Sequence, residues 1–310
     1  MSRAVGKPLA CTPVSSVREM SEAGSWSIPP LFENLVDDAS LLMPREGMPS
    51  VADVVARYLD GRGAPYGRLT GQLVSPLSRL PEVVAEVAAA APSRPVELSL
   101  LVDTGLGALP KALSMVLSRS SLVTPRTVEA PAPPDVDATW LERVAEFVPD
   151  DVLPVVEPRR PLQGDTQAWL DAVQRVAEHG CTPKLRCGGP RPSDIPSDDE
   201  VADFLEVAGA AGHGCVTSLG LRHAVRPADG AGAPPARRAH GILNLLVASA
   251  RVKSSGDVRS ALRSTDGSAL AKEVGRLSTR AVKGVRAMLG RCAAGPTPVT
   301  AAELAGLGLL

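Results

Sequence analysis

Short β-type segments recur along this chain at a nearly constant interval. Five of them end near Ser75, Asp103, Glu129, Glu157 and Arg186, so that successive ends lie 28, 26, 28 and 29 residues apart. Each interval has room for one helix, one strand and two short loops. Units of this kind in series build parallel sheets, because each helix returns the chain to the same edge of the sheet. The spacing therefore predicts an α/β protein.

Amphipathic helical patterns separate these strands. Apolar residues keep helical spacing over 51–58, 140–147, 169–176 and 201–208. Helix starts are indicated by Asp165 and by capping boxes that begin at Ser197 and Thr300. Six or seven such units, with an eighth strand expected near 288–293, predict a single (β/α)8 barrel of TIM type over residues 29–310.

A doubly wound open sheet is the alternative architecture. It would be supported by a Gly-rich dinucleotide fingerprint after a strand. Gly105 and Gly107 open a helix in the right place, but Pro110 stands where a third glycine would be. The barrel is therefore the preferred fold.

Three segments depart from the repeating pattern. Residues 1–28 lack periodicity and are predicted to form a loose N-terminal arm. Residues 227–239 (PADGAGAPPARRA) have low complexity and would lie where barrel loops carry function, either as a mobile lid or as a tolerated insertion. Residues 256–291 predict one or two charged helices.

Composition narrows the classes of partner. The 310 residues are 44% hydrophobic and 22% charged, with a formal net charge of −1, which argues against a nucleic-acid or membrane surface. The five cysteines are an odd number scattered over the chain, which is typical of reduced thiols. Neither a secretory signal nor an apolar stretch of ~20 residues is present. We expect a cytoplasmic protein, and its oligomeric state stays open.

Strand alternation predicts what faces the barrel interior. In the sixth predicted strand, TPKLRCGG, Lys184 and Arg186 share one face, and the apolar residues between them face the helices. A buried charge costs several kcal/mol unless it is paired, so both cations need acidic partners. Glu129 and Glu157 on neighbouring strands are the candidates. The same parity gives further inward pairs: Thr70 with Gln72, Thr127 with Glu129, Val155 with Glu157, and Glu97 with Ser99 and Asp103.

These charges support either a structural network or a site at the strand ends. As a site, Asp103, Glu129 and Glu157 could hold Mg²⁺, which prefers oxygen ligands, much as in enolase-type barrels. The chain has no room for the separate N-terminal capping domain of those enzymes. Alternatively, Lys184 could form a Schiff base, as in class I aldolases, if burial and Arg186 lower its pKa. Both comparisons rest on the fold alone.

Residues beyond the seventh predicted strand add candidates for substrate binding. Arg222, His223 and Arg226 could bind an anionic substrate at the barrel mouth or be solvated loop residues. His240, with Asn244 one helical turn later, could face the same mouth. The sequence carries no nucleotide, haem or zinc motif.

Several blocks resemble an uncharacterised bacterial family. LVDDASLLMP and GRLTGQLVSPLSRL are similar to its "IDDAGLFPPA" and "GRFVCPASRL". KLRCGG, TSLGLRHAVR, HGILNLL and ELAGLGLL are similar to its "KLRTGG", "FKATAGLHHPVR", "HGFLNLL" and "LRALGLL". The resemblance spans residues 31–310 and implies one barrel domain without implying a reaction. The residues to which it directs attention are Asp37, Asp38, Lys184, Arg186, Gly188, Gly189, Gly220, His223, His240 and Asn244. Asp37 and Asp38 are thereby added to the candidates for substrate binding.

The chain also departs from this pattern. Val216 stands where the family has a lysine, Arg222 replaces the first of two histidines, and GRCAAG replaces a Gly-Ser-Cys-Ser-Phe block. Two hypotheses follow. In the first, the protein is a lyase or isomerase acting on a small anionic carboxylate or phosphorylated metabolite, with Lys184, Arg186 and His223 as catalytic residues. In the second, it is a non-catalytic barrel that binds a metabolite or a partner.

Overall fold

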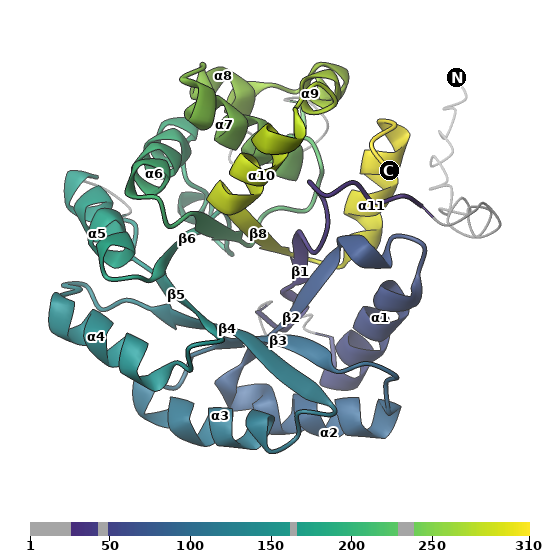
Figure 1. Ribbon diagram of the computed structural model, residues 1–310, viewed down its shortest axis with the longest axis vertical. Coiled ribbons are helices and arrows are strands. Elements are labelled where there is room, and N and C mark those ends of the chain that lie inside the picture. Colours follow the sequence, from purple (N-terminus) through teal and green to yellow (C-terminus); the bar gives the residue numbers. More distant parts are fainter. Residues whose placement is uncertain (1–25, 43–48, 162–165, 229–238) are drawn as a thin grey trace, which may run out of the picture.

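The computed structural model describes residues 26–42, 49–161, 166–228 and 239–310. Within them, parallel strands pair in chain order and β1 pairs with β8, so the sheet closes into a (β/α)8 barrel (Figure 1). The barrel prediction is confirmed, and the open sheet is wrong. The strands are β1 (Val36–Asp38), β2 (Thr70–Pro76), β3 (Val96–Leu101), β4 (Val123–Pro131), β5 (Leu153–Glu157), β6 (Thr182–Arg186), β7 (Cys215–Ser218) and β8 (Leu289–Ala294).

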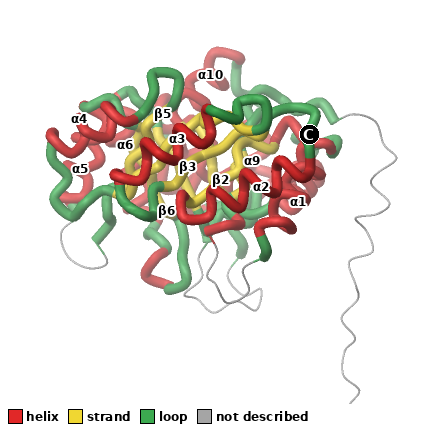
Figure 2. Tube along the Cα trace, turned by 90° about the horizontal axis from the view of Figure 1, so that it is seen from below, coloured by secondary structure: helices red, strands yellow, loops and turns green. Residues whose placement is uncertain are grey.

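Helices surround the barrel, as Figures 1 and 2 show. They are α1 (Val51–Gly63), α2 (Leu80–Ala90), α3 (Leu109–Leu117), α4 (Ala138–Phe147), α5 (Gln167–Glu178), α6 (Asp198–Ala211), α7 (Ile242–Ser254), α8 (Val258–Arg263), α9 (Gly267–Val274), α10 (Thr279–Met288) and α11 (Thr297–Gly306). Short 3-10 helices are η2 (Ser40–Leu42), η3 (Gly67–Leu69), η4 (Leu77–Arg79), η5 (Leu106–Ala108) and η6 (Pro192–Asp194). Between α7 and β8 the chain forms three short helices, where one or two were expected.

Helix starts follow local chemistry in most cases. The Ser197 hydroxyl accepts the Glu200 N–H and the Glu200 carboxylate accepts the Ser197 N–H, so the predicted capping box of α6 is confirmed. The predicted box at Thr300 is wrong, because α11 already begins at Thr297, directly after Pro296. Asp165 lies outside the described residues.

The two irregular segments are only partly described. Residues 1–25 and 229–238 fall outside the described part, so the expected arm and loop are not tested there. Ile28 is buried in the core, and the Trp26 ring lies 6.1 Å from that of Tyr66. The described residues are therefore packed against the domain from Trp26 onward. No described helix has the length and apolar character needed to span a lipid bilayer.

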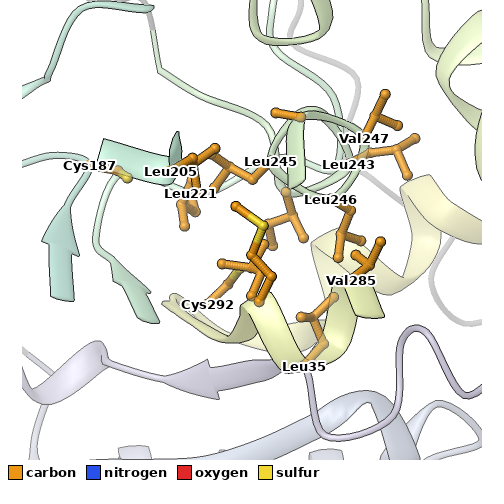
Figure 3. Packing of buried hydrophobic residues seen from close by; sticks show 14 of the residues in the cluster. Leu35, Cys187, Leu205, Leu221, Leu243, Leu245, Leu246, Val247, Val285 and Cys292 are labelled. Carbon is orange, nitrogen blue, oxygen red and sulfur yellow. The ribbon is translucent and has the colours of Figure 1, made fainter. Parts of the chain in front are cut away.

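The space between barrel and helices is filled mainly by aliphatic side chains. Leu243, Leu245 and Leu246 of α7 pack with Cys187 and Cys292 from the β6 and β8 regions (Figure 3). A second cluster joins α1–α4 to the outer faces of β2–β4. The helical periodicities of the sequence correspond to these buried faces.

Inward side chains form layers contributed by alternate strands, as tilted barrels require. One layer holds Val74, Glu129, Lys184 and Ala293, from β2, β4, β6 and β8. The next layer toward the C-terminal strand ends, here called the mouth, holds Ala39, Leu101, Glu157 and Ser218. Half of each layer is apolar and half is polar, and the polar half lies on β4–β7.

Candidate functional site

Lys184 occupies the centre of the polar half of the barrel. Its side chain is 1% exposed, and its Nζ lies 2.5 Å from Glu129 Oε2 and 3.1 Å from Glu157 Oε2. Glu129 also accepts a 2.5 Å hydrogen bond from Ser99. Arg186, two residues nearer the mouth on β6, donates from Nε to Glu157 Oε1 at 2.7 Å. Alternation therefore places both cations and both partners as the sequence predicts; we call Glu129, Glu157, Lys184 and Arg186 the charge cluster.

The charge cluster is ionised at neutral pH. Burial by itself raises the pKa of Glu129 and of Glu157, but Lys184 outweighs it and lowers both, with Arg186 adding to the effect on Glu157. Burial alone lowers the pKa of Lys184, yet the two carboxylates raise it above its usual value. The expectation that burial and Arg186 depress the pKa of Lys184 is therefore wrong. A lysine held as an ammonium is a poor nucleophile for a Schiff base and a good proton donor.

A second buried ion pair lies on the β8–β1 side. Asp37 is fully buried; its Oδ1 accepts the Gln72 N–H at 2.7 Å, and its Oδ2 lies 2.9 Å from Arg291 Nε without the alignment of a hydrogen bond. Burial raises the pKa of Asp37 to about 6, against the opposing attraction of Arg291. Asp37 therefore titrates closer to neutrality than an ordinary aspartate.

The three carboxylates expected to bind Mg²⁺ do not meet. Asp103 lies beyond the end of β3, exposed, and accepts hydrogen bonds from the Ser78 N–H at 3.0 Å and from the Ser78 hydroxyl. Glu129 and Glu157 both form ion pairs with Lys184. Among the described residues, no group of three or more His, Cys, Asp or Glu side chains is arranged to hold a metal ion. The predicted ligand set is therefore wrong for Asp103, and we derive no step through a metal.

One other parity prediction fails for a local reason. The Thr70 hydroxyl bonds Thr297 of α11, because the β1–β2 register shifts after Thr70, whereas Gln72 points inward and accepts from Thr127 at 2.7 Å. Glu97 lies on the same face of β3 as Ser99, as predicted, but it is only partly buried and pairs with Arg126 at 2.9 Å.

The residues just beyond β7 are tied to the C-terminal helix. The half-exposed His223 places its Nδ1 2.7 Å from Glu303 Oε1, and the Ala224 N–H donates to the other oxygen at 2.6 Å. Arg222 is exposed. The structure gives His223 a partner in α11 and shows no contact between it and the charge cluster. Its predicted catalytic role stays a prediction without geometric support.

Two predicted substrate ligands are hydrogen-bonded within the protein. Asn244 accepts the Arg226 N–H at 2.9 Å and donates to Ala261 O at 2.8 Å and Ser264 O at 2.7 Å. The Arg226 guanidinium bonds Asp198 and the carbonyl of Leu262. These bonds fasten the start of α7 to α6 and α8, which satisfies their side chains within the protein.

The side chains of His240 and Asp38 are likewise buried and hydrogen-bonded within the protein. His240 donates from Nε2 to Pro196 O at 2.8 Å, and burial lowers its pKa. Asp38 accepts the Ser40 N–H at 2.9 Å, which forms a local turn at the end of β1. Neither side chain joins the charge cluster in the structure.

The structure adds three residues that sequence reasoning missed. Arg291 supplies an inward cation from β8, Glu303 fixes His223, and the Ser218 hydroxyl is buried on the inward face of β7 without a hydrogen-bond partner among the described residues. Ser218 was detectable from alternation, since it shares the face of Val216, the register partner of Lys184. No protein-family model matches the sequence, and no curated protein does. The family resemblance therefore stays a prediction.

Proposed function

We propose that this protein is a barrel enzyme, a lyase or isomerase, acting on a small anionic metabolite at the mouth. The observation that carries the proposal is the buried Lys184 ammonium, held between Glu129 and Glu157 directly beneath the mouth layer. A barrel that needed only stability would fill these layers with Val, Ile and Leu. In barrel enzymes the site lies at this end of the strands.

Lys184 would act as the electrophilic group. An ammonium has three N–H donors, and two of them point to Glu129 and Glu157. The third is left for a substrate carbonyl oxygen, whose developing negative charge a buried cation stabilises strongly. Glu129 would be a positioning residue, because it is fully buried and holds Lys184 without reaching the mouth.

Glu157 would be the proton acceptor. Its side chain is 16% exposed, it lies in the mouth layer, and it is ionised. Each of its oxygens has a second lone pair beyond those facing Lys184 and Arg186. As an isomerase, it would take a proton from the hydroxyl-bearing carbon next to the carbonyl, and the resulting enediolate would be reprotonated at the former carbonyl carbon. As a lyase, it would take the proton of the hydroxyl on the carbon one further from the carbonyl, so that the carbon–carbon bond breaks to give a carbonyl product and an enolate, which is then protonated.

Hydrogen–deuterium exchange tests this function. Small 2-oxo and 2-hydroxy acids and their phosphorylated analogues are incubated with the protein in D₂O, and exchange or cleavage is followed by proton NMR. We expect exchange in at least one compound and its loss in Glu157→Gln. The matched control is Glu97→Gln, which removes a barrel glutamate paired outside the site. Exchange that persists in Glu157→Gln, or no turnover anywhere in the panel, would refute the proposal.

One observation favours a non-catalytic binding barrel as the second candidate. The charge cluster is internally neutral, with two cations facing two carboxylates, which suits a structural network as well as a site. Under this alternative, panel compounds raise the melting temperature of the protein, with a stabilisation that grows with the logarithm of their excess over Kd. None of them would exchange or be cleaved.

A further inference from the structure

The Ser218 hydroxyl is the most unusual polar group at the mouth. It is 0% exposed and has no hydrogen-bond partner among the described residues. A buried hydroxyl without a partner costs about 1–3 kcal/mol, so most native proteins avoid one. The neighbouring Thr217 faces the opposite side and donates to Cys292. By alternation Ser218 therefore points into the barrel, in the same layer as Glu157.

Arg186 lies beside it. Arg186, Ser218 and Ala293 are register partners on three adjacent strands. The Cys187 N–H, just beyond β6, donates to the Ser218 carbonyl at 2.7 Å and holds the ends of β6 and β7 together. The Ser218 hydroxyl is thus an unused donor next to the strand that carries Arg186.

The glycines keep this edge free of side chains. A Cβ on Gly188 would lie 2.6 Å from Gly220 Cα, and a Cβ on Gly220, whose φ is +70°, would lie 2.5 Å from Cys187 O. Only glycine at both positions lets the two loops approach this closely. The loops after β6 and β7 therefore pack backbone against backbone at this edge of the mouth.

Arg186 supplies the charge. Its guanidinium has five N–H donors, of which two face Glu157, and the side chain is 44% exposed. Guanidinium and carboxylate geometries match well. Because the charge cluster is neutral overall, adding a single negative charge leaves less unbalanced charge than adding a dianion such as phosphate.

We propose that the Ser218 hydroxyl and the free side of Arg186, its register partner, form a subsite for the carboxylate of a monocarboxylate substrate. The inference rests on the proposed function in placing the ligand at the mouth. It goes further by naming the substrate class and the residues that anchor it. The substrate would then place its carbonyl toward Lys184 and its charged end toward β6 and β7.

Binding measurements on two serine variants test the subsite. Acetate, glycolate and pyruvate are titrated by calorimetry and NMR into wild type, Ser218→Ala and Ser249→Ala, with inorganic phosphate as the dianionic probe. Ser249 in α7 is the matched control, since its hydroxyl is also buried without a described partner but lies outside the barrel. We expect Ser218→Ala to weaken the best monocarboxylate about tenfold, as losing one charge-assisted hydrogen bond does. Ser249→Ala should bind it as wild type does.

Three outcomes would overturn the subsite: equal affinity in wild type and Ser218→Ala, tighter binding of phosphate than of every monocarboxylate, or no monocarboxylate binding to wild type at millimolar concentrations. Both variants remove an unsatisfied group, so both should fold, and their melting temperatures check this. The exchange assay separates the two proposals. Turnover lost in Glu157→Gln but untouched in Ser218→Ala would leave the enzyme proposal standing without this subsite.

Discussion

Removing the buried ammonium of Lys184 should be among the most damaging single changes in this protein. Across 2.5 Å, at an effective dielectric constant of about 20, the attraction to Glu129 is about 7 kcal/mol. Desolvation of the two ions offsets much of that, so the net contribution of the intact pair is small. In Lys184→Met the attraction is lost but the two carboxylates of Glu129 and Glu157 stay buried and face each other. We expect the free energy of unfolding to fall by about 3–5 kcal/mol.

Neutralising the partner should restore most of the loss. In Lys184→Met/Glu129→Gln the amide can still accept from Ser99, and Glu157 keeps Arg186. We expect the double variant to lie within about 2 kcal/mol of wild type, as replaced buried ion pairs commonly do. The coupling energy from the four proteins should then exceed about 2 kcal/mol. Urea unfolding followed by circular dichroism measures all four values.

The pH dependence gives an independent readout. In wild type the pKa of Glu129 is lowered by Lys184, so its contribution to stability is present above the unfolded pKa and is lost as pH falls through the folded one. In Lys184→Met burial, which raises that pKa, is opposed only by the Ser99 hydrogen bond and the more distant Arg291, so the variant should gain stability as pH falls from 7 to 5. If Lys184→Met costs less than about 1 kcal/mol, or the double variant is as unstable as the two single losses combined, the buried-pair reasoning is wrong.

Three further changes test other parts of the structure. Burial raises the pKa of Asp37 from 3.8 to about 6. Between these two pH values the folded state binds more protons than the unfolded state, so the protein loses stability as pH rises through this range. Asp37→Asn should make the free energy of unfolding depend less on pH there, which urea unfolding at several pH values measures. Gly188→Ala should lower stability by about 1–3 kcal/mol because its Cβ meets Gly220, whereas Gly63→Ala, with nothing within 4 Å, should be neutral or stabilising in thermal melts. Asn244→Ala should lower the free energy of unfolding by about 3 kcal/mol, because three buried hydrogen bonds are lost. The affinity for monocarboxylates, measured by calorimetry, should not change. Weaker binding would show that Asn244 contributes to the binding site.

The charge cluster was predictable because it depends only on strand alternation and strand order. Lys184 and Arg186 lie in the middle and at the end of a regular strand, and their partners lie on the two preceding strands. Asp103 does not follow the alternation rule, because β3 ends at Leu101 and alternation no longer determines the direction of a side chain beyond the strand. Thr70 departs from the alternation rule because the register between β1 and β2 shifts directly after it, and no sequence pattern indicates this shift.

The remaining errors concern contacts between distant parts of the chain. Arg226 was a candidate ligand because it lies just past the seventh predicted strand, and Asn244 because it lies one helical turn after His240. Their partners lie in α6 and α8, which sequence spacing cannot bring together. Arg291 was missed because GRCAAG has little strand character, and only the register with β1 and β7 shows that it points inward.

The division of the mouth into two halves links the charge cluster to the kind of ligand expected. On the β8–β3 side, the small apolar cluster of Ala39, Val74 and Ala293 is extended by Leu101 and Leu219. Leu219 adopts φ +61°, a conformation that a bulky side chain rarely takes and that the fold must hold in place. On the β4–β7 side lie the charge cluster and Ser218. A surface with one apolar and one charged half orients a ligand that carries both characters, so a monocarboxylate with a short apolar end should bind better than one that is polar throughout. If glycolate bound more tightly than 2-oxobutyrate, the apolar half would have no part in recognition.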